Sequence, residues 1–183
     1  MKKTDSEITT TKKLVGTAVF SALAYVVSWL EFPIFPGASF LKLDFSLVFI
    51  LLAGFLFGPI SGVCASLIKE LIRFFTSSTG GVGEIANFIV TVAFIIIPTI
   101  VYSIKKGLPT VMITLIIGSV LEIIMSLLAN RFINFPLYMG ESAKEMFNSL
   151  WYFIVLFNLI KTVAVSILTI LLYKRISRFI KGL

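Results

Sequence analysis

The sequence predicts an all-α integral membrane protein, a compact bundle of six transmembrane helices, from two observations. The first is composition: 58% of the 183 residues are hydrophobic, only 14% are charged, and the apolar residues stand in long runs. Long apolar runs with few charges are what the hydrocarbon core of a bilayer selects. The second is the placement of the basic residues, which gather at the borders of the apolar runs, as they do in membrane proteins.

Six apolar segments follow one another along the chain. A polar tail is expected over residues 1–11, and residues 12–183 are expected to form one membrane domain. As a helix, the second segment would rise only about 21 Å, which is less than the roughly 30 Å of the hydrocarbon core. We expect helices at approximately 12–30, 44–57, 59–75, 84–104, 109–129 and 150–173.

The connectors are marked by residues that interrupt helices. "EFPIFPGASFLKL" separates the first two segments with two prolines and a glycine, Gly58-Pro59 ends the second, and "TSSTGGVG" precedes the fourth. A longer polar connector is expected before the sixth helix. Because Pro33, Phe35 and Pro36 follow the first segment without an Ala-x-Ala site, we interpret it as a retained helix and not as a cleaved signal peptide.

The basic residues predict the orientation. Six segments place both termini on one side, and with the N-terminus inside, the inner ends carry ten basic residues against three in the outer connectors. We therefore expect a multi-pass protein of the plasma membrane with both termini in the cytoplasm. The ten are Lys2, Lys3, Lys12, Lys13, Lys105, Lys106, Lys174, Arg175, Arg178 and Lys181, and the three are Lys42, Arg131 and Lys144.

Several classes of function are disfavoured. The clustering of basic residues at membrane borders argues against nucleic-acid binding, despite the net charge of +7. A single cysteine, Cys64, and no histidine argue against a disulfide and the usual zinc sites. "TGGVGE" lacks the Gly-Lys-Ser/Thr ending of a phosphate-binding loop and follows no predicted strand. We expect no enzymatic activity, no metal and no cofactor.

Ionisable residues within the apolar segments are costly, and they usually face a cavity or one another. In the third segment Glu70 and Arg73 stand three apart and can pair on one helix face, close to Lys69. In the fifth, Glu122 has no partner on its own helix. It must find a cation on another helix, bind a ligand or be protonated.

Two further segments carry candidate binding residues. Asn158 and Lys161 share one face of the sixth helix, where they form either a helix-packing hydrogen bond or, as we favour, a ligand contact. The glycines of "TGGVGE" either bring the backbone close to a partner or form a turn with Glu84 as a first-turn acid. Asn87 adds an amide at the same helix end.

Lys42 and Asp44 precede the second segment, and two explanations stay open. Asp44 can cap the helix by accepting hydrogen bonds from the N–H groups of Ser46 or Leu47, with Lys42 as a solvated loop charge. Alternatively, the loop folds over a pocket and both side chains face a ligand.

The first helix carries small residues on one face. Ala18 and Ala22 lie one turn apart, and this spacing allows close helix packing in lipid. The partner helix is either within the bundle or in another protein.

Three motifs together indicate a family. "LKLDFS", "GFLFGPISG" and "TGGVGEIANF", in that order and spacing, resemble the riboflavin-specific substrate-binding subunit (S component) of energy-coupling factor (ECF) transporters, and the similarity covers essentially the whole chain. One departure is Leu47, where an acidic residue is expected. The resemblance implies high-affinity riboflavin binding from the external face, with energy supplied by a coupling subunit and two ATPase subunits. It also implies that Ala18 and Ala22 dock on the coupling subunit.

On this resemblance riboflavin is the transported ligand and not a cofactor. The alternatives are an S component for another vitamin and a membrane scaffold without transport. The residues expected to bind the ligand are Lys42, Asp44, Glu84, Asn87, Asn130, Asn158 and Lys161.

Overall fold

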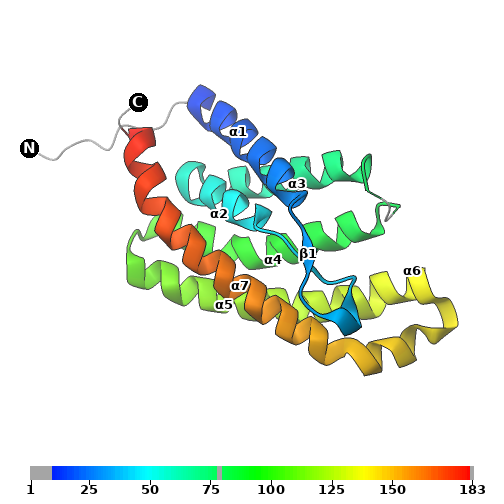
Figure 1. Ribbon diagram of the computed structural model, residues 1–183. Coiled ribbons are helices and arrows are strands. Elements are labelled where there is room, and N and C mark those ends of the chain that lie inside the picture. The colour runs from blue at the N-terminus through cyan, green and yellow to red at the C-terminus, as the bar shows by residue number, and fades with distance from the viewer. Residues whose placement is uncertain (1–9, 78–79, 182–183) are drawn as a thin grey trace, which may run out of the picture.

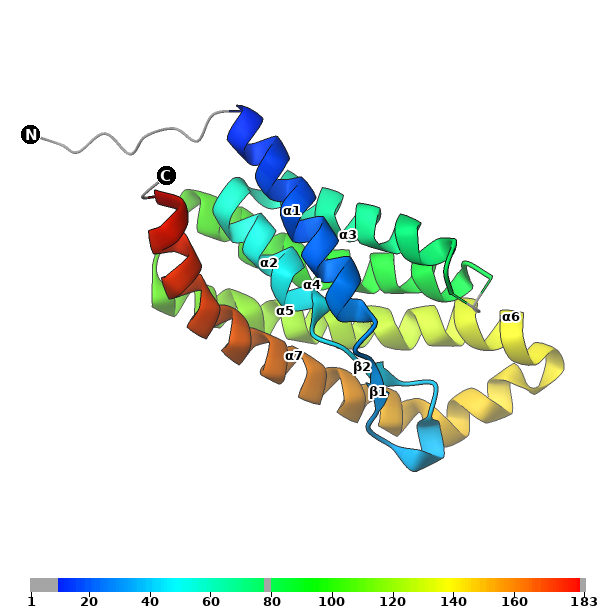
Figure 2. The ribbon, with the colours of Figure 1, turned by 45° about the horizontal axis from the view of Figure 1, so that its top comes forward.

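The structure is a computed structural model that describes residues 10–77 and 80–181, with 174–181 described by their backbone alone. Most of the predicted polar tail, including Lys2 and Lys3, lies outside the described residues. The long helices pack side by side, and the start of α1 and the end of α7 lie at the same end of the molecule (Figures 1 and 2). These helices are α1 (Thr10–Ser28), α2 (Ser46–Phe57), α3 (Pro59–Phe74), α4 (Val82–Ile104), α5 (Leu108–Ala129) and α7 (Ala143–Lys181).

The all-α class is confirmed, and the predicted helix boundaries hold to within a few residues except at the sixth segment, where the helix begins earlier than predicted and ends at Lys181 instead of Tyr173. The expected polar connector there is helical: it forms a π-helical turn, η2 (Asn130–Asn134), then α6 (Phe135–Met139) and η3 (Gly140–Ser142), and α7 begins seven residues before Leu150. "AKEMFNSL" is rich in helix formers, and its apolar side chains pack against a buried cluster that includes Phe135 and Ile154. Apolarity alone was the wrong criterion, because this helix start is amphipathic.

The loop between α1 and α2 has more structure than its prolines predict. Two short strands, β1 (Phe32–Pro33) and β2 (Lys42–Leu43), pair antiparallel around a 3₁₀ turn, η1 (Pro36–Ala38). Leu41 and Leu43 are buried in the same cluster as Phe157 of α7. This loop, residues 29–45, is therefore held against the N-terminal half of α7.

Helix α2 lies at the centre of the bundle. It contacts α1, α3, α4 and α7, and most of its side chains are buried. Gly58 has a φ of 105° at the sharp turn into α3, a conformation that favours glycine. Gly54 and Gly62 let α2 and α3 approach closely, because a Cβ atom added at Gly62 would lie 3.2 Å from the Cα atom of Gly54. The predicted short segment is thus a core helix.

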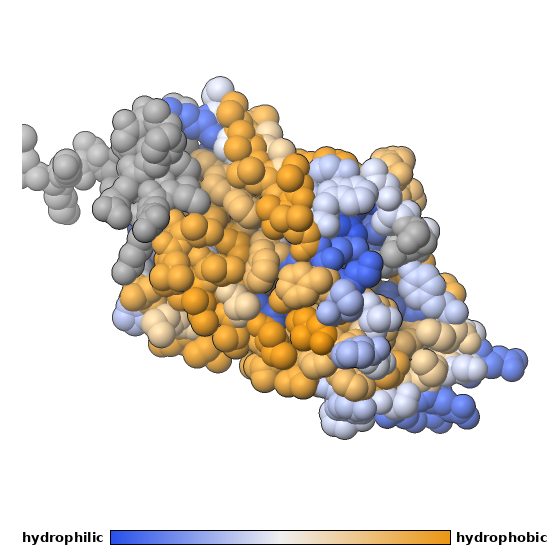
Figure 3. All heavy atoms as spheres, viewed as in Figure 1, coloured by the Kyte–Doolittle hydropathy of each residue, from blue (hydrophilic) through white to orange (hydrophobic). Residues whose placement is uncertain are grey.

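The outer surface is largely apolar. Figure 3 shows hydrophobic side chains over much of one face, with hydrophilic ones gathered toward the turns that join α3 to α4 and α6 to α7. Exposed large apolar residues include Val19 on α1, Ile113 and Ile116 on α5, and Ile167 on α7. Within the described residues, α4 and the continuous helical stretch Leu108–Tyr173 are long and apolar enough to cross a membrane, and α2 is a shorter apolar helix. Such a surface suits hydrocarbon better than water.

Candidate ligand-binding site

A cavity of about 460 Å³ lies at the end of the bundle that carries the 29–45 loop. This volume is within the range of roughly 300–1,000 Å³ found for small-molecule sites. Residues of the 29–45 loop, of helices α2 to α7 and of the turn η2 line this cavity. All seven residues predicted to bind a ligand line it: Lys42, Asp44, Glu84, Asn87, Asn130, Asn158 and Lys161.

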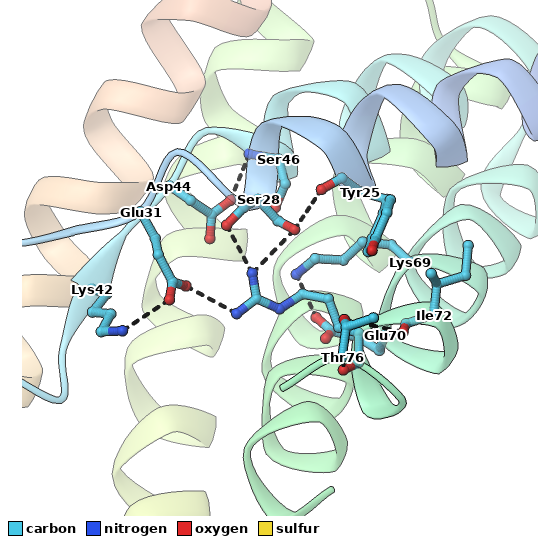
Figure 4. Close-up of polar contacts among 11 residues, drawn as sticks. Tyr25, Ser28, Glu31, Lys42, Asp44, Ser46, Lys69, Glu70, Ile72 and Thr76 are labelled. Carbon is cyan, nitrogen blue, oxygen red and sulfur yellow. Dashed lines mark hydrogen bonds and ion pairs between the residues drawn. The ribbon is translucent and has the colours of Figure 1, made fainter. Parts of the chain in front are cut away.

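The loop is fastened to the rim of this cavity by ion pairs (Figure 4). The Glu31 carboxylate lies 2.9 Å from the Lys42 ammonium and 3.0 Å from the Arg73 guanidinium. Arg73 also donates to the backbone carbonyl of Ser28 at 2.8 Å. Ser28 is the last residue of α1, and Glu31 lies in the loop. The Arg73 side chain of α3 therefore holds both the end of α1 and the loop. Glu31 was missed in the sequence because nothing local marks a loop acid as a long-range partner.

The predicted pairing within α3 is wrong. Glu70 accepts a hydrogen bond from the adjacent Lys69 at 2.7 Å, and both side chains are buried, whereas Arg73 turns to Glu31. Lys69 engages the Glu70 carboxylate, and Arg73 is engaged by Glu31 and by the Ser28 carbonyl. Lys69, Glu70 and Arg73 all line the cavity. Charged residues are rare inside apolar segments, and this rarity could have indicated that the three residues belong to the site.

Asp44 makes a local hydrogen bond and also belongs to the cavity lining. Its Oδ1 atom accepts from the Ser46 N–H at 2.7 Å, as predicted, although α2 begins at Ser46 and Phe45 has the cap position. Lys42, about half exposed, pairs with Glu31 at the rim. The loop therefore covers the cavity and contributes charged groups to it.

Amide side chains form a polar strip where α5 meets α7. Asn158 donates to Ser126 Oγ at 2.8 Å, and Asn130 donates to the Ser126 carbonyl at 2.8 Å. Asn134 in turn donates to Asn130 Oδ1 at 3.2 Å. Asn158 thus makes the helix-packing hydrogen bond and lines the cavity as well. The strip joins the two helices and presents amides to the interior.

Lys161 connects the same wall to Glu122. The Nζ atom lies 3.1 Å from Glu122 Oε1, so Glu122 finds its cation on another helix. Glu122 is fully buried, and Lys161 keeps a small exposed surface.

The start of α4 contributes the buried Glu84 and the exposed Asn87 to the cavity lining. Gly81 has a φ of 90°, and a Cβ atom there would lie 2.2 Å from the Phe74 ring. Turn geometry and packing on α3 therefore account for this glycine without a ligand. Residues 78–79 of the same turn lie outside the described part.

Aromatic side chains supply the apolar walls. Phe40, Phe135 and Phe157 line the cavity, and the rings of Phe40 and Phe135 meet edge to face with centroids 5.7 Å apart. Among the described residues no group of three or more His, Cys, Asp or Glu could hold a metal ion. The cavity is suited to a flat organic ligand with a polar periphery.

The small residues of α1 divide between two faces. Ser21 and Ala24 are buried against the bundle, whereas Ala18 and Ala22 are exposed. Ala18 and Ala22, the predicted small-residue face, therefore lie on the outer surface of the described chain.

Comparison with known proteins identifies the family. The model of the "ECF transporter, substrate-specific component" family matches residues 12–173. The chain belongs to this family of S components. It is 35% identical over 175 residues to the riboflavin transporter RibU of Staphylococcus aureus (strain TCH60), with 93% of each chain covered. It is 28% identical over 182 residues to the riboflavin transporter FmnP of Bacillus subtilis (strain 168), with 93% of this chain and 94% of FmnP covered.

A solved structure agrees in fold. This S component matches the structure described as "Structure and mechanism of the S component of a bacterial ECF transporter" with a TM-score of 0.83 and 34% sequence identity. The match covers 94% of this chain and 99% of the other. As members of this family, such chains are membrane proteins that serve as the substrate-specific component of a transporter.

Replacing Glu31 with Gln should loosen the 29–45 loop. The amide cannot hold two cations, and loss of a partly buried charged partner costs about 1–3 kcal/mol. We expect backbone amides of the loop to exchange hydrogen roughly 5- to 100-fold faster in ligand-free protein, measured by mass spectrometry. Glu141→Gln, at an exposed acid of η3, is the control. Equal exchange in the two variants would show that Glu31 does not fasten the loop.

Proposed function

We propose that this S component binds riboflavin in the 460 Å³ cavity and delivers it as part of an ECF importer. One observation carries the proposal: in a chain 35% identical to a riboflavin transporter, the predicted polar residues meet the aromatic walls around a single cavity. That cavity has the volume of a small-molecule site.

The lining chemistry suits a flavin. The flat isoalloxazine ring needs apolar and aromatic surfaces, which Phe40, Phe135 and Phe157 offer. The ribityl hydroxyls and the polar ring edge need hydrogen-bonding groups, which Asn130, Asn158 and their neighbours supply. Lys42, Asp44, Glu84, Asn87 and Lys161 complete the proposed contacts.

The chain acts without enzymatic activity of its own in this proposal. Two ATPase subunits supply the energy, and a coupling subunit joins them to the S component. The exposed Ala18 and Ala22 support α1 as the docking helix, because small exposed residues allow close approach of a partner helix in lipid.

The proposed topology is a six-helix bundle in the plasma membrane with α1 to α5 and α7 as its helices and both termini in the cytoplasm. The excess of basic residues at the terminal end of the bundle supports this orientation. The cavity then opens to the exterior, where a vitamin is captured.

A single thiol tests the orientation. In a Cys64→Ser background, cysteine placed at Lys106 in the α4–α5 turn should react with a membrane-impermeant maleimide only after the cells are opened. Cysteine placed at Lys144 near the start of α7 should react in intact cells. The reverse pattern would invert the topology.

Titration with riboflavin tests the ligand. We expect the purified protein to quench riboflavin fluorescence with a submicromolar Kd. Asn158→Ala or Lys161→Ala should weaken binding about 5- to 100-fold, because each removes a hydrogen bond to a buried ligand. Unchanged affinity in a folded variant would remove that residue from the site.

The alternatives predict different titrations. An S component for another vitamin would bind thiamine or biotin and not flavins. A membrane scaffold would bind none of these ligands saturably.

Tryptophan at both Ala18 and Ala22 tests docking separately from binding. The bulky side chains should block approach of the coupling subunit, while the cavity on the other side of α1 stays intact. We expect unchanged riboflavin affinity in the purified protein, with loss of uptake and of co-purifying ATPase subunits. Normal uptake would place docking elsewhere, and lost flavin binding would mean that this face supports the bundle.

A further inference from the structure

Lys161 differs from the other cations of the cavity in where its counter-ion lies. Lys42 and Arg73 share Glu31, and Lys69 pairs with Glu70; these two carboxylates are themselves part of the cavity lining. Glu122, the partner of Lys161, is fully buried and is not part of that lining. The Lys161 ammonium is therefore held by a carboxylate that lies outside the cavity lining.

This arrangement fixes a direction for the ammonium group. An ammonium has three N–H donors, and Glu122 Oε1 at 3.1 Å engages one side of it. Two other carboxylates of the lining are engaged through one oxygen each: Asp44 Oδ1 accepts from the Ser46 N–H, and Glu70 Oε1 accepts from Lys69. Because Lys161 itself lines the cavity, its remaining donors are available to a ligand there.

We propose that Glu122 is a positioning residue for the ligand: from behind the cavity wall it holds Lys161 so that the free donors of the ammonium face riboflavin. The inference rests on the proposed function and deepens it by adding a residue that does not touch the ligand. Glu122 acts by preorganisation, since a side chain already held in its binding geometry loses little freedom when the ligand enters.

Loss of Glu122 would act on Lys161 in two ways. The largely buried ammonium would be left without its counter-ion, which is strongly unfavourable. Asp44 and Glu70, on other elements, are carboxylates of the same cavity lining. The flexible lysine side chain would turn toward them and enter the volume that the ligand occupies.

A double-mutant cycle on riboflavin affinity separates positioning from a general structural role. The variants are Glu122→Gln, Lys161→Met and the double variant, purified in detergent, checked for monodispersity and titrated with riboflavin by fluorescence quenching. We expect Glu122→Gln to raise the Kd about 10-fold or more, and Lys161→Met at least as much. In the Lys161→Met background, adding Glu122→Gln should change the Kd less than about 2-fold, because Glu122 acts only through Lys161.

Glu122→Asp supplies a rescue arm. It keeps the negative charge one methylene further back, so it should bind riboflavin more tightly than Glu122→Gln. If the Gln variant does not fold, the same cycle is run with Asp, whose smaller loss of affinity should likewise vanish in the Lys161→Met background.

Two results would overturn the inference alone. In one, Glu122→Gln binds riboflavin as the unmodified protein does. In the other, its full loss of affinity persists when Lys161 is already Met, which would mean that Glu122 supports the bundle independently. If the unmodified protein does not bind riboflavin, the proposed function itself fails, and the inference fails with it.

Discussion

Pairing of charges inside an apolar bundle is the constraint on which the rest of this structure depends. An unpaired ion in such surroundings costs several kcal/mol, so each buried or half-buried cation must be met by a carboxylate. Arg73 and Lys42 converge on Glu31, Lys69 meets Glu70, and Lys161 meets Glu122. The Arg73–Glu31 pair joins α3 to the loop, and the Lys161–Glu122 pair joins α5 to α7. The polar lining of the cavity is a product of this pairing.

The membership of the site could be predicted from the sequence because polar residues are conspicuous in apolar helices. Asn158 and Lys161 stand on one face of an otherwise apolar helix, and this shared face does not depend on where the helix begins or ends. Asp44 was placed correctly beside the start of α2 because its hydrogen bond to the Ser46 N–H is a local interaction. Whether these residues contact a flavin stays a prediction.

The pairing itself could not be predicted, because it depends on segments far apart in the chain. Arg73 and Glu31 are separated by 42 positions, and only the folded loop brings them together. Local spacing favoured Glu70–Arg73, yet the buried Lys69 competed for the same carboxylate. The helical connector before α7 was missed for another reason: its helix is amphipathic, and apolar runs were the signal used to find helices. Local rules failed where tertiary contacts decide.

The shortness of α2 accounts for the depth of the cavity. Its 12 residues rise about 18 Å, which is less than the roughly 30 Å of the hydrocarbon core, so this central helix cannot fill the length of a membrane-spanning bundle. Ser46 and Leu47, at that first turn, belong to the cavity lining. The space beyond the first turn of α2 belongs to the cavity in which we propose that the ligand binds. A polar cavity can therefore lie at the end of an otherwise apolar bundle, because the central helix ends short of it.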